Sequence, residues 1–129
     1  MKKLLLVVGL IFFLTPSLTS ADDYDEKKKK CMLENFLEID NDRASHEIEI
    51  ACGHVQSSNP DWSEPAKCVL KNITKASEKN NQAARLIVWA CDYLQSSNPE
   101  WSKPAKCILN NIAKAKSDGS AKNIEKICN

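Results

Sequence analysis

Residues 51–76 read ACGHVQSSNPDWSEPAKCVLKNITKA, and residues 90–115 read ACDYLQSSNPEWSKPAKCILNNIAKA. At this offset of 39 residues, 18 of the 26 positions are identical, a level of agreement that chance does not produce. The chain therefore contains an internal duplication, and the repeating unit decides the fold.

A third copy of the unit becomes visible when the repeat is cut at its Lys-Cys start. The three starts read KCMLENF at 30–36, KCVLKNI at 67–73 and KCILNNI at 106–112. Each unit closes on a second cysteine, which lies 21, 23 and 21 residues after the first. We therefore expect one domain, residues 31–129, built from three repeats spanning 31–52, 68–91 and 107–128.

Each unit is expected to fold as a helix, a turn and a second helix. Apolar residues such as Leu70, Ile73 and Ala76 recur at helical spacing, and polar turn formers such as Asn80 and Asn81 follow them. Little apolar alternation and only two glycines after residue 21 argue against a sheet. The fold class is all-α: three tandem disulfide-stapled helical hairpins, about six short helices, in a small repeat or bundle domain. Both a short solenoid and a globular bundle remain open.

All six cysteines lie after residue 30, and an even number in a short exported chain indicates three disulfides. Within each unit, the midpoint between the two cysteines falls inside the polar turn, so the cysteines of an antiparallel hairpin should lie level. This argument predicts the bridges Cys31–Cys52, Cys68–Cys91 and Cys107–Cys128. The alternative joins Cys52 to Cys68 and Cys91 to Cys107, and leaves Cys31 to pair with Cys128.

The connectors between units carry two prolines each. The residue before a proline avoids the helical region, so the first Asn-Pro pair of each connector should end the preceding helix. We expect the next helix to start at a serine N-cap, with the second proline in its first turn. The residues concerned are Asn59-Pro60, Ser63 and Pro65 in the first connector, and Asn98-Pro99, Ser102 and Pro104 in the second.

The N-terminal residues 1–21 have the pattern of a secretory signal peptide. Two lysines precede an apolar run that is too short for a membrane anchor, and small residues offer a cleavage site after Ala21. We therefore expect a secreted, extracellular protein, or a periplasmic one if the source is bacterial. The next segment, residues 22–30, reads DDYDEKKKK and is expected to be a disordered charged arm, with a short propeptide as the alternative.

Several function classes lack support in the sequence. Removal of residues 1–21 leaves 16 basic and 17 acidic side chains, so no basic excess favours nucleic acid or an anionic membrane. Phosphate loops, nucleophile elbows and metalloprotease motifs are absent from the sequence, so we expect a non-enzyme without cofactors. His46 and His54 lie eight residues apart, which is not the spacing of a metal-binding pair on a helix, so no metal is expected.

The candidate binding residues are Trp62 and Trp101, which occupy matching places in the two connectors, together with the neighbouring Asn59 and Asn98. A repeated tryptophan is suited to anchor a partner, and packing across the junction is the alternative. Asn72, in Asn72-Ile73-Thr74, is a candidate N-glycosylation site if the source is eukaryotic.

The function expected from these features is a secreted, non-enzymatic interaction protein, effector-like or similar to venom and salivary proteins. Its partner would be an extracellular protein that the sequence does not identify. One alternative is an extracellular carrier of small apolar ligands, and a further one is a membrane-active antimicrobial protein. The near-neutral charge weighs against the antimicrobial alternative, because helices that act on membranes are usually strongly basic.

Overall fold

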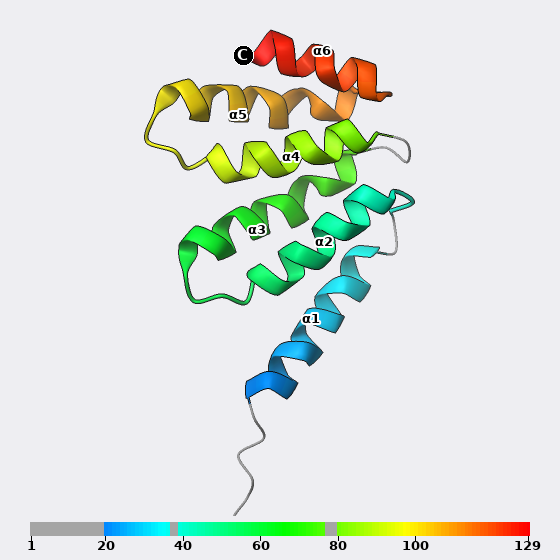
Figure 1. Cartoon of the computed structure of the whole chain (residues 1–129), viewed down its shortest axis with the longest axis vertical. Coiled ribbons are helices and arrows are strands. Elements are labelled where there is room, and N and C mark those ends of the chain that lie inside the picture. The colour runs from blue at the N-terminus through cyan, green and yellow to red at the C-terminus, as the bar shows by residue number, and fades with distance from the viewer. Residues whose placement is uncertain (1–19, 37–38, 77–79) are drawn as a thin grey trace, which may run out of the picture.

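The computed structural model describes residues 20–36, 39–76 and 80–129, and this part of the chain is helical with short connections (Figure 1). The helices are α1 (Ser20–Phe36), α2 (Asp42–His54), α3 (Pro60–Asn72), α4 (Asn81–Tyr93), α5 (Pro99–Asn111) and α6 (Asp118–Cys128). Short 3-10 turns, Ile73–Lys75 and Ile112–Lys114, extend α3 and α5. The all-α fold predicted from the repeat is confirmed.

The helices stack in chain order, and each helix runs in roughly the opposite direction to the one before it (Figure 1). The C-terminal ends of α1, α3 and α5 lie on one side of the stack, and the two Asn-Pro connectors lie on the other (Figure 1). Helix α4 packs against both α2 and α6, so the even-numbered helices form a continuous row. The units therefore stack as a short solenoid, the first of the two arrangements left open by the sequence.

The core runs through the stack between successive helices. Half of its twenty buried apolar residues are alanines, which allow the helices to approach closely. The largest fully buried apolar side chains are Ile48, Ile73, Ile87, Ile108 and Ile112. Truncation of one such isoleucine to alanine typically costs about 2–5 kcal/mol.

The three disulfides join the helices of each hairpin. They are Cys31–Cys52, Cys68–Cys91 and Cys107–Cys128, with Cα–Cα distances of 5.6, 5.5 and 5.5 Å. The structure therefore contains the disulfides predicted within the units, and it does not contain the alternative disulfides across the connectors. Closing loops of this length stabilises each unit by about 3 kcal/mol in the chain-entropy model.

The starts of α3 and α5 differ from the prediction. Each helix begins four residues earlier than expected, and the asparagine of the Asn-Pro pair, not the serine, is the N-cap. The Oδ1 atom of Asn59 accepts a hydrogen bond from the backbone N–H of Asp61 at 3.0 Å, and Asn98 does the same for Glu100 at 2.9 Å. Proline is favoured directly after such a cap because its missing N–H is unpaired there in any case. Ser63 and Pro65 consequently lie inside α3, as Ser102 and Pro104 do inside α5.

Residues 22–30 are helical, and the expectation of a disordered arm is wrong. They form most of the N-terminal half of α1, and contacts with α2 explain why they are ordered. The hydroxyl of Tyr24 donates to the carbonyl oxygen of Gly53 at 3.3 Å, and Lys28 pairs with Glu49 at 3.5 Å. A Cβ atom at Gly53 would lie 3.0 Å from the Tyr24 hydroxyl oxygen, so the absent side chain allows this approach.

The expected signal peptide, residues 1–21, lies outside the described residues apart from its last two positions, which belong to the first turn of α1. In the described ranges, every helix is too short or too polar to cross a lipid bilayer.

Candidate functional site

Trp62 and Trp101 lie at the third position of α3 and α5, so they belong to helices and not to loops. Their side chains remain 52% and 44% exposed. Each also packs across a junction between units: Trp62 meets His54 of α2 edge-on at 4.7 Å, and Trp101 stacks on Tyr93 of α4 at 4.9 Å. The packing across the junction, which was the alternative expectation, is therefore present, and each indole also keeps a surface open to solvent.

Asn59 and Asn98, the other two candidate binding residues, are exposed N-caps of the same helices. Their side-chain oxygens bond to the first turn of α3 and α5, as described above. These two asparagines position the tryptophans because they fix where each helix begins.

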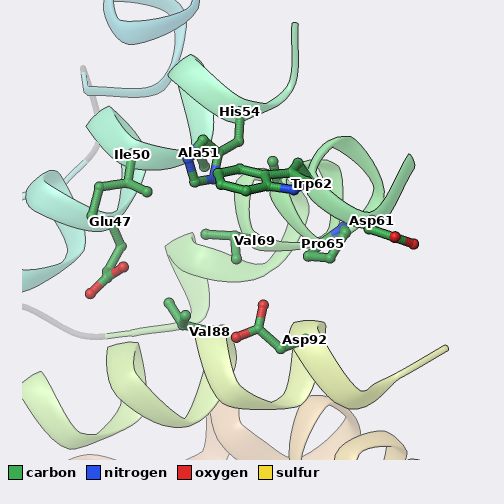
Figure 2. Close-up of a pocket in the computed structure, with 11 residues that line it drawn as sticks. Glu47, Ile50, Ala51, His54, Asp61, Trp62, Pro65, Val69, Val88 and Asp92 are labelled. Atoms are coloured by element: carbon green, nitrogen blue, oxygen red, sulfur yellow. The ribbon is translucent and has the colours of Figure 1, made fainter. Parts of the chain in front are cut away.

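A pocket of about 280 Å³ lies beside Trp62 at the first junction, between α2, α3 and α4 (Figure 2). Its apolar wall includes Pro65 and Val69 of α3 and Val88 of α4. Figure 2 shows Trp62 lying between His54 and this wall, at the upper side of the pocket. The pocket thus combines an indole with aliphatic surface.

Two carboxylates enter the pocket from different helices. Asp92 extends from α4 toward the space beneath Trp62, and Glu47 extends from α2 on the other side, whereas Asp61 points away (Figure 2). Glu47 is buried and pairs with Arg43 one helical turn earlier, at 2.5 Å. Within the described part of the chain, Asp92 has no hydrogen bond or ion pair.

The pKa of Asp92 is raised above the usual range of an aspartate. Burial of the carboxylate is the main cause, the negative charge of Glu47 adds to it, and His54 partly offsets both. Asp92 as a whole is exposed, so its carboxylate is only partly withdrawn from solvent. The pocket therefore has an excess of negative charge that its own side chains do not neutralise.

The second junction offers an internal comparison. At the offset of 39, Glu47, Ile50 and His54 correspond to Leu86, Trp89 and Tyr93. Trp89 and Tyr93 lie 5.0 Å apart, and Tyr93 stacks on Trp101, so three rings are in contact at the second junction. Gly53, the counterpart of Asp92, brings no charge to the first unit. The two junctions have the same backbone plan, but Glu47 lines the pocket of the first, whereas Leu86 and a cluster of three rings lie at the second.

Asn72, the candidate glycosylation site, is buried at the end of α3. Its Nδ2 donates to the carbonyl oxygen of Cys68 at 2.8 Å, and its Oδ1 accepts from Lys75 at 2.7 Å. Asn35 and Asn111 make the same 2.8 Å bond to Cys31 and Cys107. The asparagine four residues after each opening cysteine is thus a structural element of the repeat.

No local sequence pattern indicates Glu47, Pro65, Val88 or Asp92 as site residues, because the pocket forms only where three helices of two units meet. A signal was nevertheless present. Several pocket positions are those at which the two copies differ in size or charge, including Glu47/Leu86, Ile50/Trp89 and His54/Tyr93.

All cysteines of the described ranges are in disulfides, and these ranges contain no group of three or more His, Cys, Asp or Glu side chains arranged to hold a metal ion. His46 is exposed on α2, and His54 contacts Trp62.

A comparison of the chain with models of protein families, with curated proteins and with solved structures gives no match.

Proposed function

We propose that the protein is a secreted, non-enzymatic interaction protein that recognises another extracellular protein through the first junction. The observation that carries the proposal is the pocket beside Trp62, whose lining differs at several positions from the equivalent residues of the second junction, where Trp89, Tyr93 and Trp101 are in contact. A duplicated scaffold whose two copies differ at these positions is consistent with a dedicated contact site.

The physical chemistry of interfaces supports a role for Trp62. Tryptophan is enriched among the residues that dominate binding energies, because a large rigid ring buries much apolar area at a small entropic cost. Trp62 is half exposed and is held in place by the Asn59 cap and by His54, so it is ordered before a partner arrives. Such preorganisation lowers the entropic cost of association.

Secretion agrees with the three disulfides, which persist in oxidising compartments, and with the signal-like pattern of residues 1–21. The alternative of an apolar-ligand carrier is less favoured by the pocket itself. An apolar molecule there would remove water from Asp92 and Glu47 without replacing its hydrogen bonds, which is costly.

Site-specific photo-crosslinking tests the proposal. A photoreactive residue replaces Ile50, which is 42% exposed and lines the pocket, or Ile127, which is 81% exposed on α6 at the other end of the stack. The disulfide-bonded protein is irradiated in the extracellular fluid into which it is released. We expect adducts from position 50 that are absent from position 127 and are lost on Trp62→Ala. The same adducts from both positions would contradict the proposal.

A double variant separates recognition from packing. Trp62→Ala with Trp101→Ala should abolish the adduct at position 50 but retain the helical circular-dichroism spectrum and all three disulfides. Loss of the helical spectrum instead would assign both tryptophans to packing at the junctions.

A further inference from the structure

The first-junction pocket has features that specify the chemistry of its occupant. We propose that it receives a basic side chain of the partner protein, an arginine or lysine whose aliphatic stem lies on the apolar wall and whose cation lies between Asp92 and Glu47. The proposal rests on the proposed function and names the group that the partner supplies.

The pocket has room for one long side chain. Its volume of about 280 Å³ lies just below the range of about 300–1,000 Å³ that is typical of sites for drug-sized ligands. The carboxylates in its lining disfavour a long apolar molecule there.

The walls match an aliphatic stem. Pro65, Val69 and Val88 present apolar surface, and the indole of Trp62 lies over it (Figure 2). Long basic side chains commonly lay their methylene groups along such a surface and keep the charged end at a polar site. Indole rings also attract ammonium and guanidinium groups that approach their faces.

The charged side chains that line the pocket are suited to binding one cation. Arg43 pairs with Glu47, and among the described residues no lysine or arginine pairs with Asp92. Of the two side chains that act electrostatically on Asp92, Glu47 disfavours its charged form and His54 favours it. An incoming guanidinium would compensate the unmatched carboxylate and could also bond to it in a bidentate manner.

The second junction shows what a site without this specificity looks like. Leu86 and Trp89 stand where Glu47 and Ile50 stand at the first, and the ring of Tyr93 stacks on Trp101. A basic side chain would find Leu86 there in place of the Glu47 carboxylate. The inference therefore predicts that only one of the two duplicated junctions binds a cation.

Nuclear magnetic resonance of the disulfide-bonded full-length protein tests the proposal. The indole N–H signals of the three tryptophans report on both junctions separately, and the probe is N-acetyl-arginine methylamide. Its neutral counterpart is N-acetyl-citrulline methylamide. We expect the arginine probe to shift the Trp62 signal saturably, with a dissociation constant on the order of 1 mM, and to leave the Trp101 signal in place. Equal shifts by the citrulline probe, or no saturable shift, would overturn the proposal.

Charge variants sharpen the test. Asp92→Asn should weaken binding of the arginine probe about tenfold or more. The matched control Glu100→Gln removes a carboxylate from the first turn of α5, beside Trp101, and should leave the affinity within twofold. An unchanged affinity of the Asp92→Asn protein would sink the inference. The Asp92→Asn protein is expected to fold at least as well as the parent, because it loses an unmatched charge.

A third variant converts the first junction into the second. Ile50→Trp combined with His54→Tyr should close the pocket and abolish the shift by the arginine probe while the helical spectrum remains. If the arginine probe still binds this protein with unchanged affinity, the pocket is not its site.

The outcomes separate this inference from the proposed function. If partner adducts are lost on Trp62→Ala but retained on Asp92→Asn, the first junction is the interaction surface, but the partner does not place a basic side chain in the pocket. If the arginine probe binds saturably but position 50 gives no partner adduct, the pocket does bind a cation, but the proposal that the protein recognises its partner through the first junction is wrong.

Discussion

Asn80 donates a hydrogen bond from Nδ2 to the carbonyl oxygen of Ala115, 3.3 Å away, and thereby links the second unit to the third. The same side chain caps α4, because its Oδ1 accepts from the backbone N–H of Ala83 at 2.9 Å. Asn80 is completely buried, so one amide joins two units in a place that water does not reach. Polar contacts of this kind fix how successive hairpins are stacked.

Replacement of this amide should be costly. Asn80→Ala removes the helix cap and leaves the Ala83 N–H and the Ala115 carbonyl group buried without their partner. We expect the free energy of unfolding to fall by about 2–4 kcal/mol. Chemical denaturation measures the loss, and Asn81→Ala, at the exposed next position, is the control that should change stability by less than about 1 kcal/mol. Equal effects of the two substitutions would show that the buried amide is not a link between units.

Removal of a terminal disulfide should loosen only its own unit. With Cys107→Ala and Cys128→Ala, the third hairpin loses about 3 kcal/mol of loop-closure stabilisation. Because repeats are stabilised mainly by their nearest neighbours, we expect faster amide exchange in α5 and α6 and little change in α1 and α2. Hydrogen-exchange mass spectrometry resolves these segments. Uniformly faster exchange would mean that the stack unfolds as a single cooperative unit.

The candidate glycosylation site should remain unmodified in the folded protein, because both polar atoms of the Asn72 side chain are engaged. The intact mass of protein from a eukaryotic secretory host checks this, and a mass increase of one N-glycan would contradict it. Asn72→Ala should lower the free energy of unfolding by about 1–3 kcal/mol. Asn111→Ala is a fitting comparison, since Asn111 makes the same bond to Cys107 but is followed by Ile-Ala and lacks the glycosylation pattern.

Asp92 should give the stability a distinct pH dependence. Its pKa is raised in the folded protein, so the folded state takes up a proton more readily than the unfolded chain. Ionisation of Asp92 therefore removes stability as the pH rises through the raised pKa. The groups around the carboxylate are Glu47 and His54 on α2 and Asp61 on α3.

Asp92→Asn should accordingly raise the midpoint of thermal unfolding at neutral pH, by no more than about 3 °C because the residue is partly exposed. This gain should vanish in acid, at a pH below the pKa of Asp92 in both the folded and the unfolded chain, because Asp92 is then protonated in both. Thermal melts of the two proteins over a pH series measure the difference. A gain that is the same at every pH would show that the carboxylate charge is not its cause.

The repeat made most of the fold predictable. Helical spacing marked the hairpins, and the midpoints between paired cysteines indicated the three bridges that the structure contains. The helix starts were mispredicted because two capping signals compete in each connector. Asn59 followed by proline prevailed over Ser63, since asparagine is as strong a cap as serine and proline suits the next position.

Other features depend on contacts between helices and cannot be read from local sequence. The charged segment 22–30 has no apolar periodicity of its own, but it is held by Tyr24 and Lys28 against α2. The pocket arises from the stacking of α2, α3 and α4, and its unbalanced charge arises from the approach of Asp92 to Glu47. Differences between the two copies mark several of its positions, such as Glu47/Leu86 and His54/Tyr93.

Every disulfide closes on its own unit, and this has a mechanical consequence. When the oxidised chain is pulled from its ends, each loop between paired cysteines is bypassed by the bridge and bears no tension. Apart from the terminal residues outside the bridges, such as the part of α1 before Cys31, only the two stretches between successive bridges can be drawn out. These stretches are residues 53–67 and 92–106, and each yields roughly 50 Å of contour length. A protease that unfolds its substrate and pulls it through a narrow channel as a single strand would meet two strands joined by a disulfide at each unit. The oxidised protein should therefore resist such threading even after its helices have melted, until a reductant opens the bridges.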